Sequence, residues 1–313
     1  MSGRSSGRVE RGSAFGLVIG YFLARIANDS MGSVRGKVVS RRYASQERVA
    51  TVAEKLTDRD WLIVQTVQAV KVATGHQLER LHFDLPDDGP GSAARHRRRV
   101  LSGLVDLQVL GRLERRIGGV RAGSAGFVYG LDVVGRRLLA TRDEASRTRR
   151  PVTPGLSFLQ HRLAITELYV RLVEAERGGL CDLIEFVAEP DCWRSFSGRG
   201  GARLLLKPDA YARVAASGYE YLWFIEVDRA AESRPTLKAK CQRYVDYWLS
   251  GREDTRSAVF PAVLWLVPDA RRADSLAGVI DQLSADSRAL FKVGLFEDAV
   301  PSLSGRGYAD PAA

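Results

Sequence analysis

The segment Ala262–Val267 (AVLWLV) constrains the fold most, because it has no polar residue over the length of a typical strand. A strand that lacks polar–apolar alternation is buried on both faces of its sheet. We therefore predict a three-layer α/β arrangement with helices on both sides of a sheet. The surrounding sequence predicts helices at 158–177, 237–249 and 272–283, and strands at 184–188, 204–214, 219–227, 262–267 and 291–296.

A different pattern precedes this α/β region. Thr57 is a good N-cap for a first amphipathic helix that continues to Val70, and further helices are predicted at 77–83 and 93–109. After Gly111 the period shortens to that of strands, which predicts a hairpin of 112–117 and 127–131. Three helices followed by a hairpin with a basic tip are the layout of a winged helix-turn-helix domain.

Composition divides the chain into four regions. Residues 1–45 are rich in Gly, Ser and Arg and are predicted to be a flexible extension, with Met31 as an alternative start of translation. The winged helix is predicted over 46–140, and 141–154 is a polar, proline-bounded linker. The α/β domain occupies 155–313. The fold class is thus α+β for the first domain and α/β for the second.

No membrane association is expected. The apolar stretch at 15–27 is interrupted by Arg25 and is too short to cross a bilayer comfortably. It could imitate an export signal, but no clear cleavage site follows it. The chain has three cysteines and no CxxC pair, which argues against disulfides and structural zinc and favours the cytoplasm.

The charge of the chain favours a polyanionic partner. Lys and Arg outnumber Asp and Glu by 47 to 37, a net charge of +10. Neutralising phosphates releases condensed counterions, so double-stranded DNA is the expected partner. A generally arginine-rich composition would explain the same excess without DNA.

Arginines mark the predicted DNA contacts. A recognition helix has a polar, exposed first half and an apolar second half, and the helix predicted at 93–109 has this division. Arginine suits base edges and phosphates alike because its fork binds two acceptors. The alternative is an ordinary solvated basic face. The candidate contacts are Arg95, Arg97, Arg98 and Arg99 on the helix and Arg115, Arg116 and Arg121 on the hairpin.

A second group of candidates consists of carboxylates. Asp209 follows Pro208 inside a strand pattern, and Glu226 and Asp228 end the next strand and share one of its faces. Glu167, in the middle of the helix at 158–177, would join them. Clustered carboxylates suit Mg²⁺, and Lys240 on the following helix would stabilise developing negative charge. Helix capping or pairing with neighbouring arginines would explain the same carboxylates without a metal.

Several of these motifs together resemble the replication-relaxation proteins of actinobacterial plasmids and integrative elements. The resemblance covers roughly Gln46 to Leu283. It implies a part in plasmid replication or DNA relaxation and says little about chemistry. The motifs that carry it are Leu56-Thr57-Asp58-Arg59-Asp60, Gln77-Leu78-x-x-Leu81-x-Phe83, the arginine-rich third helix, Lys207-Pro208-Asp209, Glu226-Val227-Asp228-Arg229 and Lys238-Ala239-Lys240-Cys241-x-x-Tyr244-x-x-Tyr247.

The second domain also resembles the restriction-endonuclease-like core. Such nucleases place an Asp after a Pro, followed by an acidic-x-Lys triplet on the next strand. Asp209 and Glu226 match the first two positions, whereas Asp228 stands where lysine is usual. Some relatives carry Gln-x-x-x-Tyr on the next helix, and here Lys240 takes the Gln position before Tyr244. The resemblance implies Asp209, Glu226 and Lys240 as catalytic residues, and leaves open whether the core cleaves.

Two classes of function therefore remain. The first is a DNA-binding protein of a plasmid or integrative element that acts with replication or transfer machinery in replication, relaxation or transfer of DNA. Its nuclease-like core either cleaves DNA with a metal ion or has lost that activity. Its metal ligands would come from Glu167, Asp209, Glu226 and Asp228. The second is a transcriptional or copy-number regulator whose second domain forms a homodimer or binds a partner. Metal-dependent cleavage favours the first, and a DNA site with two half-sites favours the second.

Overall fold

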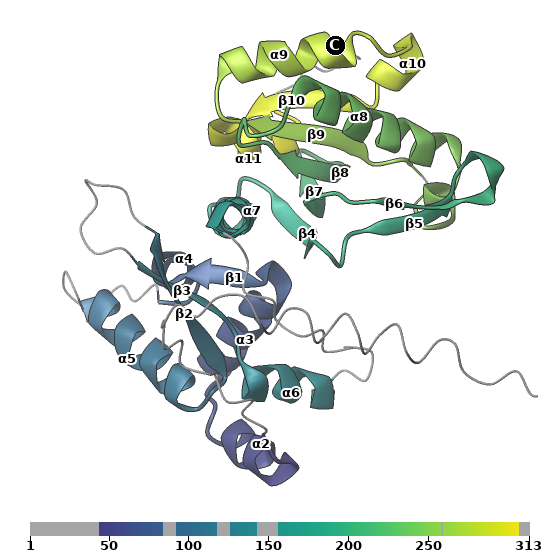
Figure 1. The fold of residues 1–313 in the computed structure, drawn as a ribbon. Coiled ribbons are helices and arrows are strands. Elements are labelled where there is room, and N and C mark those ends of the chain that lie inside the picture. The colour runs from purple at the N-terminus through teal and green to yellow at the C-terminus, as the bar shows by residue number, and fades with distance from the viewer. Residues whose placement is uncertain (1–43, 84–91, 118–125, 143–155, 258, 307–313) are drawn as a thin grey trace, which may run out of the picture. The chain divides into compact units, whose positions relative to one another are not determined.

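The apolar segment Ala262–Val267 forms strand β9 and lies inside a five-stranded mixed sheet, as predicted (Figure 1). The computed structural model describes residues 44–83, 92–117, 126–142, 156–257 and 259–306. The other strands of the sheet are β4 (Asp182–Ala188), β7 (Ala210–Ala216), β8 (Tyr219–Val227) and β10 (Phe291–Leu295). Their order is β10-β9-β8-β7-β4. β8, β9 and β10 run parallel, whereas β7 pairs antiparallel with both β8 and β4.

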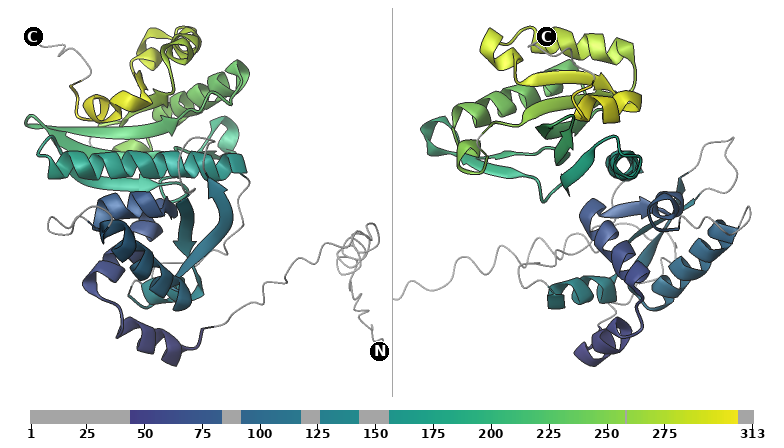
Figure 2. Two further views of the ribbon diagram at one scale, coloured as in Figure 1. Left: turned by 90° about the vertical axis from the view of Figure 1, so that its left-hand side faces the viewer. Right: turned by 180° about the vertical axis from the view of Figure 1, so that it is seen from behind.

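Helices cover both faces of this sheet (Figures 1 and 2). Ala212 and Ile225 belong to the core formed with α7 and α11, the face along which α7 lies in Figure 2. Tyr211 and Phe224, each one residue earlier on its strand, belong to the core formed with α8 and α9. This alternation follows from the two-residue period of a strand. The helices are α7 (Leu156–Arg177), α8 (Arg234–Leu249), α9 (Ala270–Ile280), α10 (Ala285–Arg288) and α11 (Ala299–Leu303).

The single strand predicted over 204–214 is wrong, because the structure divides it in two. β6 (Arg203–Leu206) pairs with β5 (Arg194–Ser197) in a separate two-stranded sheet, and β7 begins at Ala210. The break falls next to Pro208, which has no N–H for the ladder and restricts the residue before it. The break leaves Asp209 immediately before β7, where its N–H donates to the Ile225 carbonyl of β8 (3.0 Å).

The N-terminal part, residues 44–142, combines helices with a three-stranded antiparallel sheet of order β1-β3-β2. Thr57 caps α3 as predicted, and Thr74 caps α4 in the same way, so α4 begins two residues earlier than predicted. The sequence does not predict β1, which pairs with β3. The elements are α2 (Gln46–Ala53), α3 (Asp58–Val70), β1 (Val72–Thr74), α4 (Gly75–His82), α5 (Ser92–Asp106), β2 (Leu110–Ile117), β3 (Gly126–Leu131) and α6 (Val133–Arg142).

Polar contacts join α4 to α7. The Arg80 guanidinium donates to Glu167 and to Glu174 at 2.7 Å each, and Gln77 Nε2 donates to Glu167 at 3.1 Å. The hydrogen bond to Glu174 is the largest cause of the raised pKa of Arg80. The predicted extension at 1–45 and the linker at 141–154 lie almost wholly outside the described residues, but contacts cross the proposed domain boundary.

Among the residues that the structure describes, no helix is both long enough and apolar enough to cross a membrane.

His82, at the end of α4, makes stability depend on pH. Burial, together with the charges of Arg177 and Arg59, lowers the pKa of His82 to about 4. Below the ordinary histidine pKa of about 6.5, the unfolded chain therefore binds a proton that the folded chain rejects. This group lowers the free energy of unfolding as pH falls from about 6.5 towards 4, by about 2 kcal/mol at pH 5.

Urea unfolding at pH 7.5 and pH 5 measures this contribution. Between these two pH values, the free energy of unfolding of the His82→Gln variant is expected to decrease by about 2 kcal/mol less than that of the wild type. His76→Gln is the matched control, because His76 lies exposed on the same helix. Equal losses in the His82→Gln variant and the wild type would contradict the assignment.

Candidate functional site

A cavity of about 640 Å³ opens beside the carboxyl end of β8. Its walls come from α7, from the segments that follow β4 and precede β7, from the end of β8 and its following loop, and from α8. Carboxylates outnumber Lys and Arg among its lining residues. Its ionisable residues are His161, Glu189, Asp209, Glu226, Asp228, Arg229, Glu232 and Lys240.

Asp209 is held by two separate hydrogen bonds. Its Oδ2 accepts from the Val227 N–H at 2.7 Å, and its Oδ1 pairs with His161 Nε2 at 3.0 Å. The carboxyl group is thus fixed between β8 and α7. The residue is buried, yet it lines the cavity.

Glu226 lies deeper than Asp209 and uses both carboxylate oxygens. Oε1 accepts from the Tyr244 hydroxyl at 2.6 Å, and Oε2 accepts from Lys240 Nζ at 3.0 Å. Burial and the charge of Asp209 raise the pKa of Glu226, and the bonds from Lys240 and Tyr244 oppose this shift. The sequence prediction that Asp209 and Glu226 approach each other agrees with this geometry.

Lys240 reaches the cavity from α8. Its Nζ lies between Glu226 Oε2 (3.0 Å) and Glu232 Oε1 (2.9 Å). Burial alone would lower the pKa of Lys240, but the charges of Glu226 and Asp209 and the hydrogen bond to Glu232 raise it instead. Lys240 is therefore a protonated cation that is one-third exposed to the cavity.

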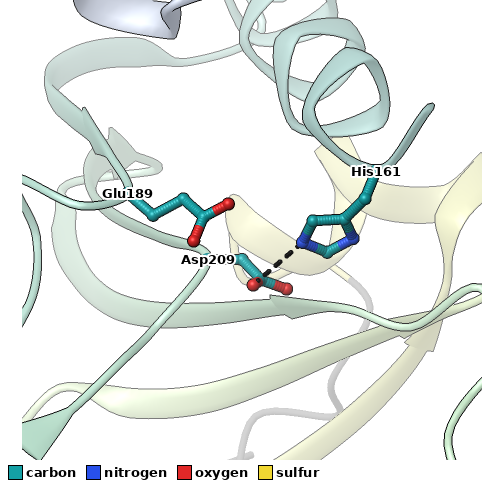
Figure 3. Close-up of side chains that lie close together, drawn as sticks. All are labelled: His161, Glu189 and Asp209. Atoms are coloured by element: carbon teal, nitrogen blue, oxygen red, sulfur yellow. Dashed lines mark hydrogen bonds and ion pairs between the residues drawn. The ribbon is translucent and has the colours of Figure 1, made fainter. Parts of the chain in front are cut away.

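His161 and Glu189 complete the cluster, and the sequence predicts neither. A ring nitrogen of His161, a Glu189 oxygen and an Asp209 oxygen all lie within 4.8 Å of one another (Figure 3). Burial would lower the pKa of His161, but Asp209 and Glu189 raise it. Burial is also the main cause of the raised pKa of Glu189. An imidazole and two carboxylates are a donor set that suits a divalent metal ion.

Glu167 lies away from the cavity. Its carboxylate accepts from Arg80 and Gln77 and pairs with Arg171. Glu167 does not line the cavity, so the geometry removes it from the candidate metal ligands.

Asp228 lines the cavity but is bonded on its far side. Oδ1 accepts from the Ala230 N–H at 2.8 Å, and Oδ2 pairs with Arg272 of α9. Its side chain is almost fully buried. Asp228 therefore anchors the loop after β8, and the structure does not support it as a metal ligand.

The arginines of α5 divide into two groups. Arg95, Arg98 and Arg99 are exposed. Arg97 instead forms an ion pair with Glu79 of α4 and is partly buried, so the structure does not support a DNA contact by Arg97. The backbone of Arg115 and Arg116 lies in β2, and Arg121 lies outside the described residues.

Comparison with known proteins identifies the family. The replication-relaxation family matches residues 64–263, which are more than half of the chain. Neither a curated protein nor a solved structure shows significant similarity. Membership implies a role linked to DNA replication or relaxation. The matched segment includes α4, α5 and the clustered residues of the cavity, and the chain belongs to the replication-relaxation family.

Proposed function

We propose that this chain binds duplex DNA through a winged helix-turn-helix domain and hydrolyses a phosphodiester bond in a restriction-endonuclease-like core. The N-terminal part forms the first domain, and residues 156–306 form the second. The setting would be replication, relaxation or transfer of a plasmid or integrative element, with the corresponding machinery as partner. Family membership supports the link to DNA. The geometry of the two parts supports DNA binding by the first and hydrolysis by the second.

The order of elements in the N-terminal part supports the winged helix. α3, β1, α4 and α5 are followed by the β2–β3 hairpin, and β1 joins the hairpin as a third strand. Leu101 and Leu104, in the second half of α5, are buried, whereas Arg98 and Arg99 in its first half are exposed. This division is what a recognition helix needs, because one half packs on the core and the other meets the groove.

The position of Lys240 carries the proposal of cleavage. Asp228 stands where such nucleases usually have lysine, but it is bonded to Arg272. Lys240 approaches from α8 instead and places its ammonium 3.0 Å from Glu226, in the cavity that Asp209 also lines. The cavity therefore contains a cation beside two carboxylates although the usual sequence position lacks it.

The donor set at the cavity fits a divalent metal ion. Asp209 and Glu189 supply carboxylate oxygens, and Glu189 Oε1 is buried without a hydrogen-bond partner. These residues would hold the ion. Mg²⁺ or a related ion acts as a Lewis acid on phosphoryl oxygens and activates water.

The chain's own residues would bind and orient the phosphate. Lys240 would stabilise the negative charge that develops on the phosphoryl oxygens as water adds to phosphorus and the P–O bond to the leaving oxygen breaks. Glu226 and Glu232 would hold the Lys240 ammonium in place, because each accepts one of its hydrogen bonds. The Tyr244 hydroxyl would in turn fix Glu226.

Incubation of the purified chain with supercoiled, linear and single-stranded DNA tests the proposed function. Metal-dependent nicking that EDTA abolishes is the expected result. DNA binding without cleavage on any substrate, with Mg²⁺ or Mn²⁺, would rule out the nuclease. That outcome would support the regulator, whose second domain serves dimerisation or partner binding.

Exchange of Arg98 and Arg99 for alanine tests the DNA interface. The double variant is expected to bind duplex DNA about 10- to 100-fold more weakly. The slope of log affinity against log salt concentration is negative, and its magnitude should decrease by about 2. The physical reason is the loss of two phosphate neutralisations. Fluorescence anisotropy over a salt series measures both quantities.

The matched control removes two exposed arginines from the C-terminal part, Arg271 and Arg288. Its net charge equals that of the Arg98→Ala/Arg99→Ala variant, so a general charge effect would weaken both equally. Equal weakening would show that α5 is not the recognition helix.

A further inference from the structure

We propose that His161, Glu189 and Asp209 form a binding site for a first-row transition-metal ion, and that the site prefers such an ion to Mg²⁺. The use of this ion in DNA cleavage rests on the proposed function. The site itself rests on the arrangement of its three side chains.

The three ligands come from separate elements and converge on one point (Figure 3). His161 lies on α7, Glu189 follows β4, and Asp209 precedes β7. Their donor atoms lie within 4.8 Å of one another. Ligands at about 2.1 Å from an ion are up to about 4.2 Å apart, so small side-chain rotations would close the set.

The carboxylate of Glu189 provides independent support. Glu189 is only 8% exposed, and its Oε1 has no hydrogen-bond partner. Arg162 Nε forms an ion pair with this oxygen at 3.5 Å, a distance too long for a good hydrogen bond. Leaving a buried carboxylate oxygen unbonded costs free energy, and a bound cation would satisfy it.

The backbone fixes two of the three ligands before any ion arrives. The Glu189 N–H donates to the Asp209 carbonyl at 2.9 Å, because β4 and β7 pair up to Ala188 and Ala210. The Val227 N–H holds Asp209 Oδ2 and leaves Oδ1 facing His161. Such preorganisation lowers the cost of ordering the ligands when the ion binds.

Among the other carboxylates that line the cavity, Glu232 pairs with Lys240 through Oε1 and has no hydrogen-bond partner at Oε2, whereas Glu226 and Asp228 use both oxygens. Both oxygens of Glu226 accept hydrogen bonds from Tyr244 and Lys240, and Asp228 is bonded to Arg272 and Ala230. The described residues that bring three donor atoms within 4.8 Å of one another include an imidazole nitrogen. Mg²⁺ takes oxygen ligands in strict octahedral geometry and dehydrates reluctantly, whereas imidazole suits first-row transition metals. The preference follows from this nitrogen donor.

Binding of Mn²⁺ to the chelator-treated full-length chain tests the proposal without any measurement of cleavage. The six-line electron paramagnetic resonance signal of free Mn²⁺ disappears when the ion binds. We expect one Mn²⁺ per chain, and we expect Mg²⁺ to displace half of it only at an excess of about 100-fold or more. Displacement by an equal concentration of Mg²⁺ would overturn the preference.

Substitutions identify the ligands. His161→Ala and, separately, Glu189→Gln are each expected to weaken Mn²⁺ binding at least about 10-fold. Glu189→Gln keeps the side-chain shape, so it serves if His161→Ala does not fold. The matched controls are His76→Ala and Glu220→Gln, both at exposed positions, and they should bind as the wild type does. Unchanged Mn²⁺ affinity in either ligand variant that folds would overturn the site.

The nicking assay separates this inference from the proposed function. The His161→Ala variant could cleave DNA with Mg²⁺ and bind Mn²⁺ as tightly as the wild type does. That result would support the nuclease and contradict the proposed metal site. Histidine-dependent Mn²⁺ binding without cleavage would leave the site in place and remove the nuclease.

Discussion

Replacing Lys240 with methionine is expected to lower the rate of metal-dependent DNA cleavage by about 10²- to 10³-fold and to leave DNA affinity unchanged. Methionine keeps the apolar stem and removes the charge. The loss falls on the rate because Lys240 would meet the charge that develops in the transition state. DNA affinity should persist because the proposed contacts lie on α5, in the N-terminal part.

The position of Lys240 makes its effect larger than that of an ordinary surface lysine. Its ammonium contacts Glu226 and Glu232 and lies over the Trp265 ring at 5.6 Å from the ring centroid. These contacts hold the charge at one point in a partly buried cavity, where electrostatic interactions are stronger than in water. Removal of the charge also leaves Glu226 without its cation, and Glu226 would then take up a proton more readily.

Lys238→Met is the matched control, because Lys238 lies two residues earlier on α8. Its Nζ is exposed and donates to Gln282, which lies just after α9. Single-turnover nicking of supercoiled DNA by both variants gives the comparison. Equal rates for Lys240→Met and Lys238→Met would show that the ammonium at the cavity has no part in the chemistry.

Much of the fold follows from the sequence where a segment is uniformly apolar. The predicted bounds of β8 and β9 agree with the structure, because β9 is apolar throughout and β8 has an apolar centre between Glu220 and Glu226. The apolar periodicity predicts starts for α8 and α9 that are too late in the sequence. In the structure, Ser233 and Asp269 cap these helices, which begin before their first apolar repeat. Capping signals of this kind are present in the sequence but depend on one side chain each.

The candidate site was predictable where it depends on neighbouring strands. The β7–β8 hairpin pairs Ala210 with Ile225, and this register brings Asp209 close to Glu226. To place Glu189 at the site, one must know that β4 pairs with β7, although β5 and β6 lie between these strands in the sequence. Such long-range pairing has no signal in a single sequence.

The helix α7 shows the same limit. Glu167 and His161 are six residues apart, so they point about 120° apart around the helix axis. The sequence shows that both residues lie on one helix. It does not show which face of that helix is turned towards the cavity at the end of the sheet. Packing of Ile165, Leu168 and Leu172 against the sheet decides this, and it directs His161 to the cavity and Glu167 towards α4.

Exchange of Arg272 for alanine is expected to lower the free energy of unfolding by about 3 to 5 kcal/mol. Arg272 pairs with Asp228, whose side chain is 1% exposed, and also donates to the Glu232 carbonyl at 2.8 Å. Its removal would leave the Asp228 carboxylate buried without its cation. The same bonds hold the loop that carries Glu232 to Lys240, so the variant should also cleave DNA more slowly.

Urea unfolding of Arg272→Ala, Asp228→Ala and the double variant measures the coupling between the two side chains. The double variant should be clearly more stable than the sum of the two single losses predicts, because it leaves no buried charge unpaired. The exposed pair Arg213 and Glu220 is the matched control, and Arg213→Ala should destabilise the chain far less than Arg272→Ala, because solvent screens an exposed ion pair. Mn²⁺ binding should persist in any Asp228→Ala protein that folds, since Asp228 acts through Arg272 and the loop. Additive losses at Asp228 and Arg272 would show that this buried pair does not organise the loop, and the lysine at the cavity would then need another support.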